Sequence, residues 1–149
     1  MAILPIRVLG DPVLRERSRP VERFDRTLRR LAEDMLETMY GAPGVGLAAN
    51  QVGFTTACFV YDDGDGHKGF VANPEVSGLE EEETHDEGCL SIPGPFYPTL
   101  RALRVRLTGP VSSSLANPPQ KARRTPRVLL GGQAVPPGRW GFRGPPSEF

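Results

Sequence analysis

The chain of 149 residues has only two histidines and two cysteines, and it has no long apolar run. Two cysteines, Cys58 and Cys89, are too few for the disulfide framework of a small secreted protein and are compatible with a reducing compartment. No segment approaches the ~20 apolar residues of a membrane span, and residues 1–15 lack the apolar stretch of a signal peptide. We therefore expect a soluble, cytoplasmic protein with no membrane partner.

Charge and composition divide the chain after residue 108. Residues 109–149 carry 6 Lys+Arg against 1 Asp+Glu, whereas residues 1–108 carry 12 against 17, so the net charge of zero is a cancellation. The same 41 residues hold 8 Pro and 6 Gly, a share above the roughly 25 to 30% typical of low-complexity sequence. We predict one domain over residues 1–108 and a disordered tail over residues 109–149, because the tail buries too little apolar surface to offset its ordering entropy.

One helix is predicted near the start of the domain. Asp25 is a suitable N-cap, and Gly41 should end the helix. Between them, apolar residues recur at helical spacing: Leu28, Leu31, Ala32, Met35, Leu36 and Met39. This spacing predicts a helix with one apolar face.

Short strands are predicted after the helix. Apolar runs over residues 57–61 and 69–76 should form strands, with a turn over residues 62–66 between them. The acidic run Glu80–Glu83 is expected in a solvated loop. A half-buried strand should follow, since three apolar residues alternate with polar ones: Leu103, Val105 and Leu107. A helix followed by short strands predicts the α+β class.

Two segments could carry chemistry. The first, GVGLAANQ over residues 44–51, has small residues whose main chain a ligand or another strand can approach, although taken alone it is more simply a loop that leads into a buried strand. Its Gln51 could stabilise an oxyanion, or it could be an ordinary polar residue at a strand end.

The second segment surrounds Cys89. Cys58 lies in an apolar run and is expected to be a small buried hydrophobe. Cys89 lies instead in EGCLSIPG, residues 87–94, where a glycine before it and a Pro-Gly turn after it favour irregular backbone. Such a placement suits either metal ligation or nucleophilic catalysis, and the cysteine alone does not choose between them.

Taken together, in this order and at about this spacing, the two segments resemble the first two motifs of the peptide deformylases. GDPVLR at residues 10–15 and FVANPE at residues 70–75 also resemble family segments, and the similarity covers residues 1 to about 108. The resemblance implies short antiparallel strands around helices, and an enzyme that removes the formyl group from the N-terminal formylmethionine of nascent proteins. N-formylmethionyl peptides are then the implied partners, and proximity to the ribosome is a further implication.

The resemblance also implies a role for individual residues. In that family the motif cysteine and the two histidines of a third motif, HExxH, hold a divalent metal ion and its bound water. The metal would be Fe2+, or Zn2+, Ni2+ or Co2+, with Cys89 as a ligand. The Gln51 amide and the Leu90 backbone N–H would stabilise the oxyanion, and Glu87 would orient its neighbours. The residues implied in peptide binding are Gly44, Val45, Gly46 and Arg101.

The HExxH motif is absent from the sequence. The window where the family carries it falls near residues 129–133, and glycines and prolines in and around this window oppose a helix. We do not expect His67 or His85 to replace the missing ligands. The predicted fold therefore lacks the central metal-binding helix, the metal site is incomplete and this chain is expected to be inactive.

The missing helix has a predicted structural cost. Apolar side chains that include Leu31, Met35 and Leu107 should lack a partner, which predicts a marginally stable or partly unfolded protein. The composition changes after Thr108 within an expected strand, so a frameshifted or rearranged reading of a deformylase gene is a further hypothesis.

Two other functions are alternatives to a deformylase. The main one is a non-catalytic formyl-peptide-binding protein that has kept the glycine-rich groove. A second takes the basic tail as a nucleic-acid or ribosome contact, but solvated coil is the simpler interpretation and we expect no specific nucleic acid partner. The basic residues concerned are Arg123, Arg124, Arg127, Arg139 and Arg143.

Overall fold

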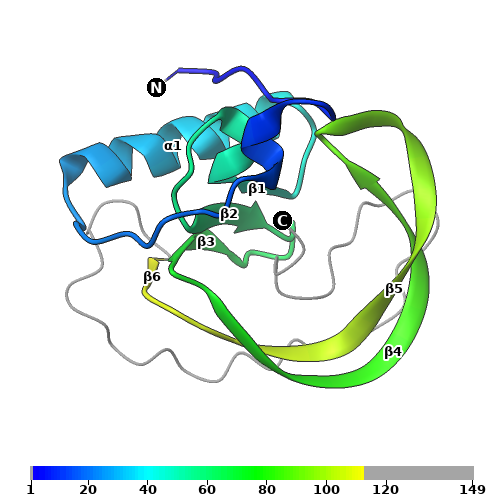
Figure 1. Ribbon diagram of the computed structural model, residues 1–149. Helices are drawn as coiled ribbons and strands as arrows, with labels where there is room; N and C mark the ends of the chain where they lie inside the picture. The colour runs from blue at the N-terminus through cyan, green and yellow to red at the C-terminus, as the bar shows by residue number, and fades with distance from the viewer. Residues whose placement is uncertain (1, 113–149) are drawn as a thin grey trace.

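The computed structural model describes residues 2–112 and has two sheets, one α-helix and two short 3-10 helices. The elements are, in chain order, η1 (Pro12–Arg15), α1 (Arg26–Gly41), β1 (Gly46–Ala48), η2 (Ala49–Val52), β2 (Cys58–Asp62), β3 (Lys68–Ala72), β4 (Glu75–Cys89), β5 (Ile92–Thr108) and β6 (Val111–Ser112). One antiparallel sheet has the order β1-β2-β3-β6, and β4 and β5 pair in a second, two-stranded sheet. Figure 1 shows α1 lying along the four-stranded sheet and the β4–β5 hairpin arcing away from it. The predicted α+β class is confirmed.

The predicted helix is present, with the predicted ends. The Asp25 carboxylate accepts hydrogen bonds from the backbone N–H groups of Thr27 (2.9 Å) and Leu28 (3.1 Å), so it satisfies two donors that the helix leaves open. The helix ends at Gly41, as the sequence predicts.

The apolar face of α1 is buried against the sheet. Met35 and Met39 pack with Leu47 and Val60, and all four side chains are 0% exposed. The prediction that Met35 lacks a partner is therefore wrong. Leu31 packs against the same cluster, and Leu107 packs against a second cluster with Phe59 and Val71, so these two side chains also have partners.

An extended segment at the N-terminus runs along α1. The Ala2 N–H donates to the Asp34 carboxylate (2.8 Å), and the Leu4 N–H donates to the Thr38 hydroxyl (2.8 Å). Because Asp34 and Thr38 are one helical turn apart, these two bonds hold the segment parallel to the helix. Leu4 and Ile6 then pack against the core.

The strands β2 and β3 confirm the predicted pair, but β3 ends at Ala72 rather than at Val76. Asn73 adopts a left-handed conformation with φ of 47°, which interrupts the strand. Its side chain accepts from the Val21 N–H (2.7 Å) and donates to the Val21 carbonyl (3.0 Å). The break between β3 and β4 is therefore fixed by a tertiary contact.

The acidic run Glu80–Glu83 lies within β4, so the prediction of a loop is wrong. β5 places an arginine opposite two of the four glutamates, since Glu80 pairs with Arg104 and Glu83 with Arg101 in the strand register, while Glu82 lies opposite Ala102. Glu81 also makes an ion pair with Arg104. The glutamates remain exposed, as expected, but they lie in a two-stranded sheet rather than in a loop.

The hairpin buries few of its side chains. Val105 is buried and Leu103 and Leu107 are half-buried, which confirms the predicted alternation in β5. Several other large apolar side chains of the hairpin are at least 41% exposed: Val76, Phe96, Tyr97 and Leu100. Exposed apolar surface thus lies on the hairpin, whereas the core face of α1 is covered.

The predicted tail lies mostly outside the described residues. Residues 113–149 include the window near residues 129–133 and all the basic tail residues, so their predicted disorder stays a prediction. Among residues 2–112, no helix has the length and hydropathy needed to cross a membrane.

We expect thermal unfolding to occur in two steps, with the hairpin lost before the sheet and α1. The hairpin has few buried side chains, whereas α1 and the sheet share a continuous core, and regions with few buried contacts open at lower free energy. Far-UV dichroism and hydrogen exchange resolved by residue would follow the two steps. A single cooperative transition, with near-UV dichroism retained up to it, would contradict both this expectation and the predicted marginal stability.

Candidate functional site

Gln51 is the buried centre of the candidate site. It lies in η2 and is only 4% exposed, so its interpretation as an ordinary polar residue at a strand end is wrong. Its carbonyl oxygen accepts from the Ala48 N–H (2.9 Å), and its Nε2 donates to the Ser91 hydroxyl (3.2 Å). Nε2 also lies 3.8 Å from the Cys89 sulfur, within reach of a weak N–H···S bond. One amide therefore joins the glycine-rich segment to the cysteine segment.

Cys89 lies at the tip of the β4–β5 hairpin. It is the last residue of β4, it pairs with Ile92, and the strand register shifts between Glu87 and Cys89. The irregular backbone predicted around this cysteine is confirmed. Figure 1 shows that the hairpin tip returns to the N-terminal part of the fold, where the Leu9 N–H donates to the Ser91 carbonyl (2.8 Å).

Ser91 is a site residue that the sequence reasoning missed. Its side chain is 4% exposed and is bonded to Gln51. A hydroxyl residue between the apolar Leu90 and Ile92 was the available signal, because a buried hydroxyl needs a hydrogen-bond partner. Only the fold reveals that this partner is Gln51.

The glycine-rich segment contacts the cysteine segment through Gly44. A Cβ atom at Gly44 would lie 2.7 Å from Cδ1 of Leu90, so any side chain here would displace Leu90. The Gly44 N–H donates to the Met39 carbonyl (2.9 Å), and the Val45 carbonyl accepts from the Asp62 N–H (2.9 Å). The sequence also allowed a simpler interpretation of this segment, a loop that leads into a buried strand. The local backbone agrees with it, because β1 follows at Gly46 and is buried throughout.

Glu87 and Arg101 are brought together across the hairpin. Nε of Arg101 donates to both carboxylate oxygens of Glu87 (3.1 and 3.2 Å), and its Nη2 donates to Oε2 (2.9 Å). Both side chains are partly shielded from solvent, at 26% and 34% exposure. The observed partner of Glu87 is thus Arg101, and this hydrogen-bonded ion pair links β4 to β5. We call it the Glu87–Arg101 clamp.

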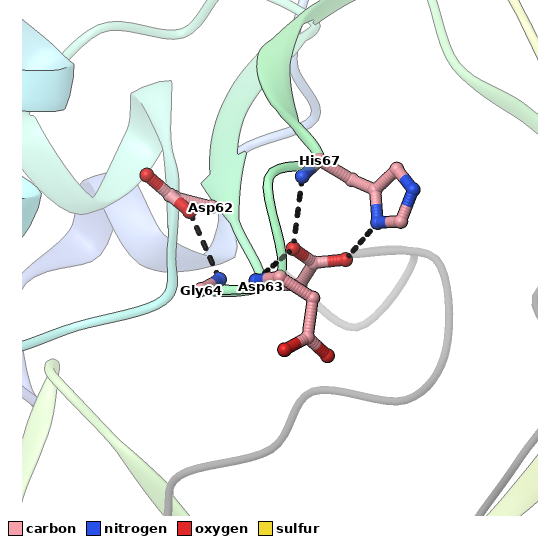
Figure 2. A network of polar contacts seen from close by, with 5 residues as sticks. Asp62, Asp63, Gly64 and His67 are labelled. Carbon is pink, nitrogen blue, oxygen red and sulfur yellow. Dashed lines mark hydrogen bonds and ion pairs between the residues drawn. The ribbon is translucent and has the colours of Figure 1, made fainter.

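His67 is held far along the chain from Cys89, in the turn between β2 and β3. Figure 2 shows its ring directed at Asp63, with 2.8 Å between Nδ1 and the Asp63 carboxylate. The same carboxylate accepts from the backbone N–H groups of Asp65 (2.9 Å) and His67 (3.1 Å). Partial burial raises the pKa of Asp63, but these hydrogen bonds outweigh it and hold the pKa below its ordinary value.

His85 does not complete a metal site either. It pairs with Thr99 in the hairpin register, and its Nε2 lies 3.4 Å from the Glu83 carboxylate. Across residues 2–112, no group of three or more His, Cys, Asp or Glu side chains could hold a metal ion. Cys89 is a single donor in this part of the chain, so the residues present do not fit the metal that the resemblance implies.

We expect Gln51→Met to destabilise the fold by about 1 to 3 kcal/mol, because the apolar side chain leaves the buried Ala48 N–H and Ser91 hydroxyl without a partner. Urea unfolding would measure the loss. Asn50→Ala is the matched control, since the neighbouring Asn50 is only half-buried, and it should change stability by less than about 0.5 kcal/mol. Equal effects of the two substitutions would contradict the role of the Gln51 amide.

The two thiols should differ in reactivity. Cys58 is 5% exposed, and burial raises its pKa from 9.0 to about 12, whereas Cys89 is half-buried at the hairpin tip. A thiol reagent near neutral pH should label Cys89 and leave Cys58 protected, which peptide mass spectrometry would resolve.

Since the folded pKa of Cys58 is raised, its contribution to stability is present below pH 9 and is lost as the pH rises towards 12. The Cys58→Ala variant should lack this alkaline loss, and a loss of the same size in that variant would refute its assignment to Cys58.

Comparisons with known proteins agree with this geometry. The model of the polypeptide deformylase family matches residues 3–111. The peptide deformylase of Acidothermus cellulolyticus is 52% identical over 109 residues, which are 73% of this chain and 60% of that protein. The peptide deformylase of Clostridium botulinum is 50% identical over 101 residues, which are 68% of each chain.

Solved structures show the same fold. The crystal structure of the Thermotoga maritima peptide deformylase superposes with a TM-score of 0.70 at 44% identity, over 73% of this chain and 74% of that one. The Synechococcus elongatus peptide deformylase, solved in complex with actinonin, gives a TM-score of 0.74 at 34% identity, over 89% of this chain and 68% of that one. The chain spans about 60% of the length of the Acidothermus protein. With its Gln51 and Cys89 segments joined as described, the chain belongs to the peptide deformylase family.

Proposed function

We propose that this chain, a member of the peptide deformylase family, does not catalyse deformylation. One observation carries the proposal: within residues 2–112 no group of three or more His, Cys, Asp or Glu side chains could hold a metal ion, and the sequence contains no HExxH motif. A catalytic zinc-type site needs about three protein ligands and an open position for water. A single thiol does not meet that requirement.

In this proposal the chain keeps the residues that would bind the peptide substrate and stabilise the oxyanion. The Gln51 amide and the Leu90 backbone N–H are the proposed oxyanion donors, and the contact of Gly44 with Leu90 keeps the two segments adjacent. In the family's reaction these groups would act on the formyl carbonyl of an N-formylmethionyl peptide. We propose Arg101 as a further peptide contact, with Glu87 holding its guanidinium in place.

We expect no formate release from an N-formylmethionyl peptide when the full chain is supplied, without oxygen, with Fe2+, Zn2+, Ni2+ or Co2+. The physical reason is the incomplete donor set. The Acidothermus cellulolyticus deformylase, assayed under the same conditions, is the positive control. Formate production by this chain that disappears in a Cys89→Ala variant would overturn the proposal, since it would show that a working metal site includes Cys89.

A non-catalytic formyl-peptide-binding protein is the second candidate, and the open edge of β1 favours it. Among the described residues, 2–112, β1 is the end strand of its sheet and pairs only with β2. The Gln51 side chain already accepts from the Ala48 N–H, so this N–H points away from β2. Alternate residues of an antiparallel strand direct their backbone groups to the same side, so Gly46 would present its backbone at this edge to an added peptide strand.

Isothermal titration calorimetry tests this candidate, with the full chain kept free of metal by a chelator and titrated with peptide. Binding of a formylmethionyl peptide, without binding of the same peptide lacking the formyl group, would support it. Absence of heat with both peptides would remove it.

We further propose that the sequence after Thr108 comes from a frameshifted or rearranged reading of a deformylase gene. The family match ends at residue 111, close to the change in composition, while the relatives continue further. Resequencing the gene over codons 100–149 and translating every frame tests this. An HExxH in another frame would support it, and no such motif in any frame would refute it.

A further inference from the structure

The side-chain amide of Gln51 is held at both ends. Its Oε1 accepts from the Ala48 N–H (2.9 Å), and its Nε2 donates to the Ser91 hydroxyl (3.2 Å). Gln51 and Ser91 are both 4% exposed, so water competes little for these contacts. The terminal torsion of a glutamine side chain is broad, and an amide held at one end only can still turn about it. The second contact, with Ser91, therefore restricts the amide to one orientation.

This orientation decides which part of the amide faces Cys89. A backbone N–H can only donate, so Ala48 selects the amide oxygen and leaves Nε2 on the side of the hairpin tip. Nε2 carries two hydrogens, and the Ser91 hydroxyl accepts one of them. The other is left for the side of Cys89, whose sulfur lies 3.8 Å from Nε2. The position of the Ser91 hydroxyl thus determines where this second hydrogen points.

The backbones of Gln51 and Ser91 are fixed independently of their side-chain contact. The Arg7 N–H donates to the Gln51 carbonyl (2.7 Å), and the Leu9 N–H donates to the Ser91 carbonyl (2.8 Å). Arg7 and Leu9 are two residues apart, so one short stretch of the N-terminal segment anchors both loops. Removal of the Ser91 hydroxyl should therefore release the amide without undocking the hairpin tip.

We propose that Ser91 is a positioning residue that acts through Gln51: its hydroxyl directs the second Nε2 hydrogen to the Cys89 side of the hairpin tip. The inference rests on the proposed function, in which the Gln51 amide and the Leu90 N–H bind the oxygen of a formyl group. A donor that is oriented before the ligand arrives needs no reorganisation when it binds. Without the hydroxyl, the amide samples several orientations and the donor is in place for only a fraction of the time, which lowers affinity by that fraction.

NMR spectroscopy of the full chain with isotope-labelled glutamine tests the orientation without a ligand, and the Gln51→Met variant identifies the Gln51 signals. We expect two distinct Nε2 proton signals, one with a nuclear Overhauser contact to Ser91 and the other with a contact to Cys89. In the S91A variant the contact to Cys89 should be lost. The exchange of the Nε2 protons with water should rise about five- to tenfold, the usual effect of one lost hydrogen bond. The S91T variant keeps the hydroxyl and should restore both.

The matched control is the S77A variant, which removes a hydroxyl from an exposed position of β4 and should leave the Gln51 signals unchanged. Three outcomes would overturn the inference: unchanged Gln51 signals in S91A, equal effects of S91A and S77A, or loss of protection of the Leu9 N–H in S91A, which would show a purely structural role. Failure of the proposed function gives a different result. A formylmethionyl peptide would then shift no signal of the unchanged chain, whereas the effect of S91A on Gln51 would persist.

Discussion

The buried amide of Gln51 is the interaction on which the assembly of this fold depends. The side-chain oxygen of Gln51 accepts a hydrogen bond from the Ala48 N–H, and its Nε2 donates one to the Ser91 hydroxyl. The backbone carbonyl of the same residue accepts from the Arg7 N–H (2.7 Å). Three parts of the chain far apart in sequence are therefore joined at one residue: the N-terminal segment, the β1–η2 junction and the hairpin tip. At 4% exposure, water cannot replace these partners, so each bond is costly to break.

Different interactions stabilise the two sheets. The four-stranded sheet is stabilised by burial, since Leu47, Val60 and Val71 have at most 1% exposure. The hairpin has little burial and relies on its register, on the Glu87–Arg101 clamp and on the attachment of its tip. Exposed charge pairs contribute little individually, which makes the hairpin the weaker part and the part most sensitive to salt.

The chemistry of the site follows from which side chains the fold brings together. It joins Gln51, Cys89 and Ser91, and it places Leu90 against Gly44, so the elements proposed to bind a formylated peptide are assembled. It holds His67 against Asp63 and His85 against Glu83, and neither pair includes Cys89. Family membership and catalytic competence are thus separate questions for this chain, because the first depends on residues 3–111 and the second on metal ligands that these residues do not supply.

The sequence by itself determined the features that depend on local spacing and on motif identity. These include α1 with its Asp25 cap, the β2–β3 pair, the alternation of Leu103 and Val105, and the family. The tertiary structure alone decided the end of β3, the placement of Glu80–Glu83 in a strand and the burial of Gln51. Each of these depends on a partner that is distant in sequence: Val21 for Asn73, Arg104 for Glu80 and Ser91 for Gln51. Periodicity in a sequence cannot specify such partners, because they are chosen by packing and by hydrogen bonding between segments that meet only in the folded chain.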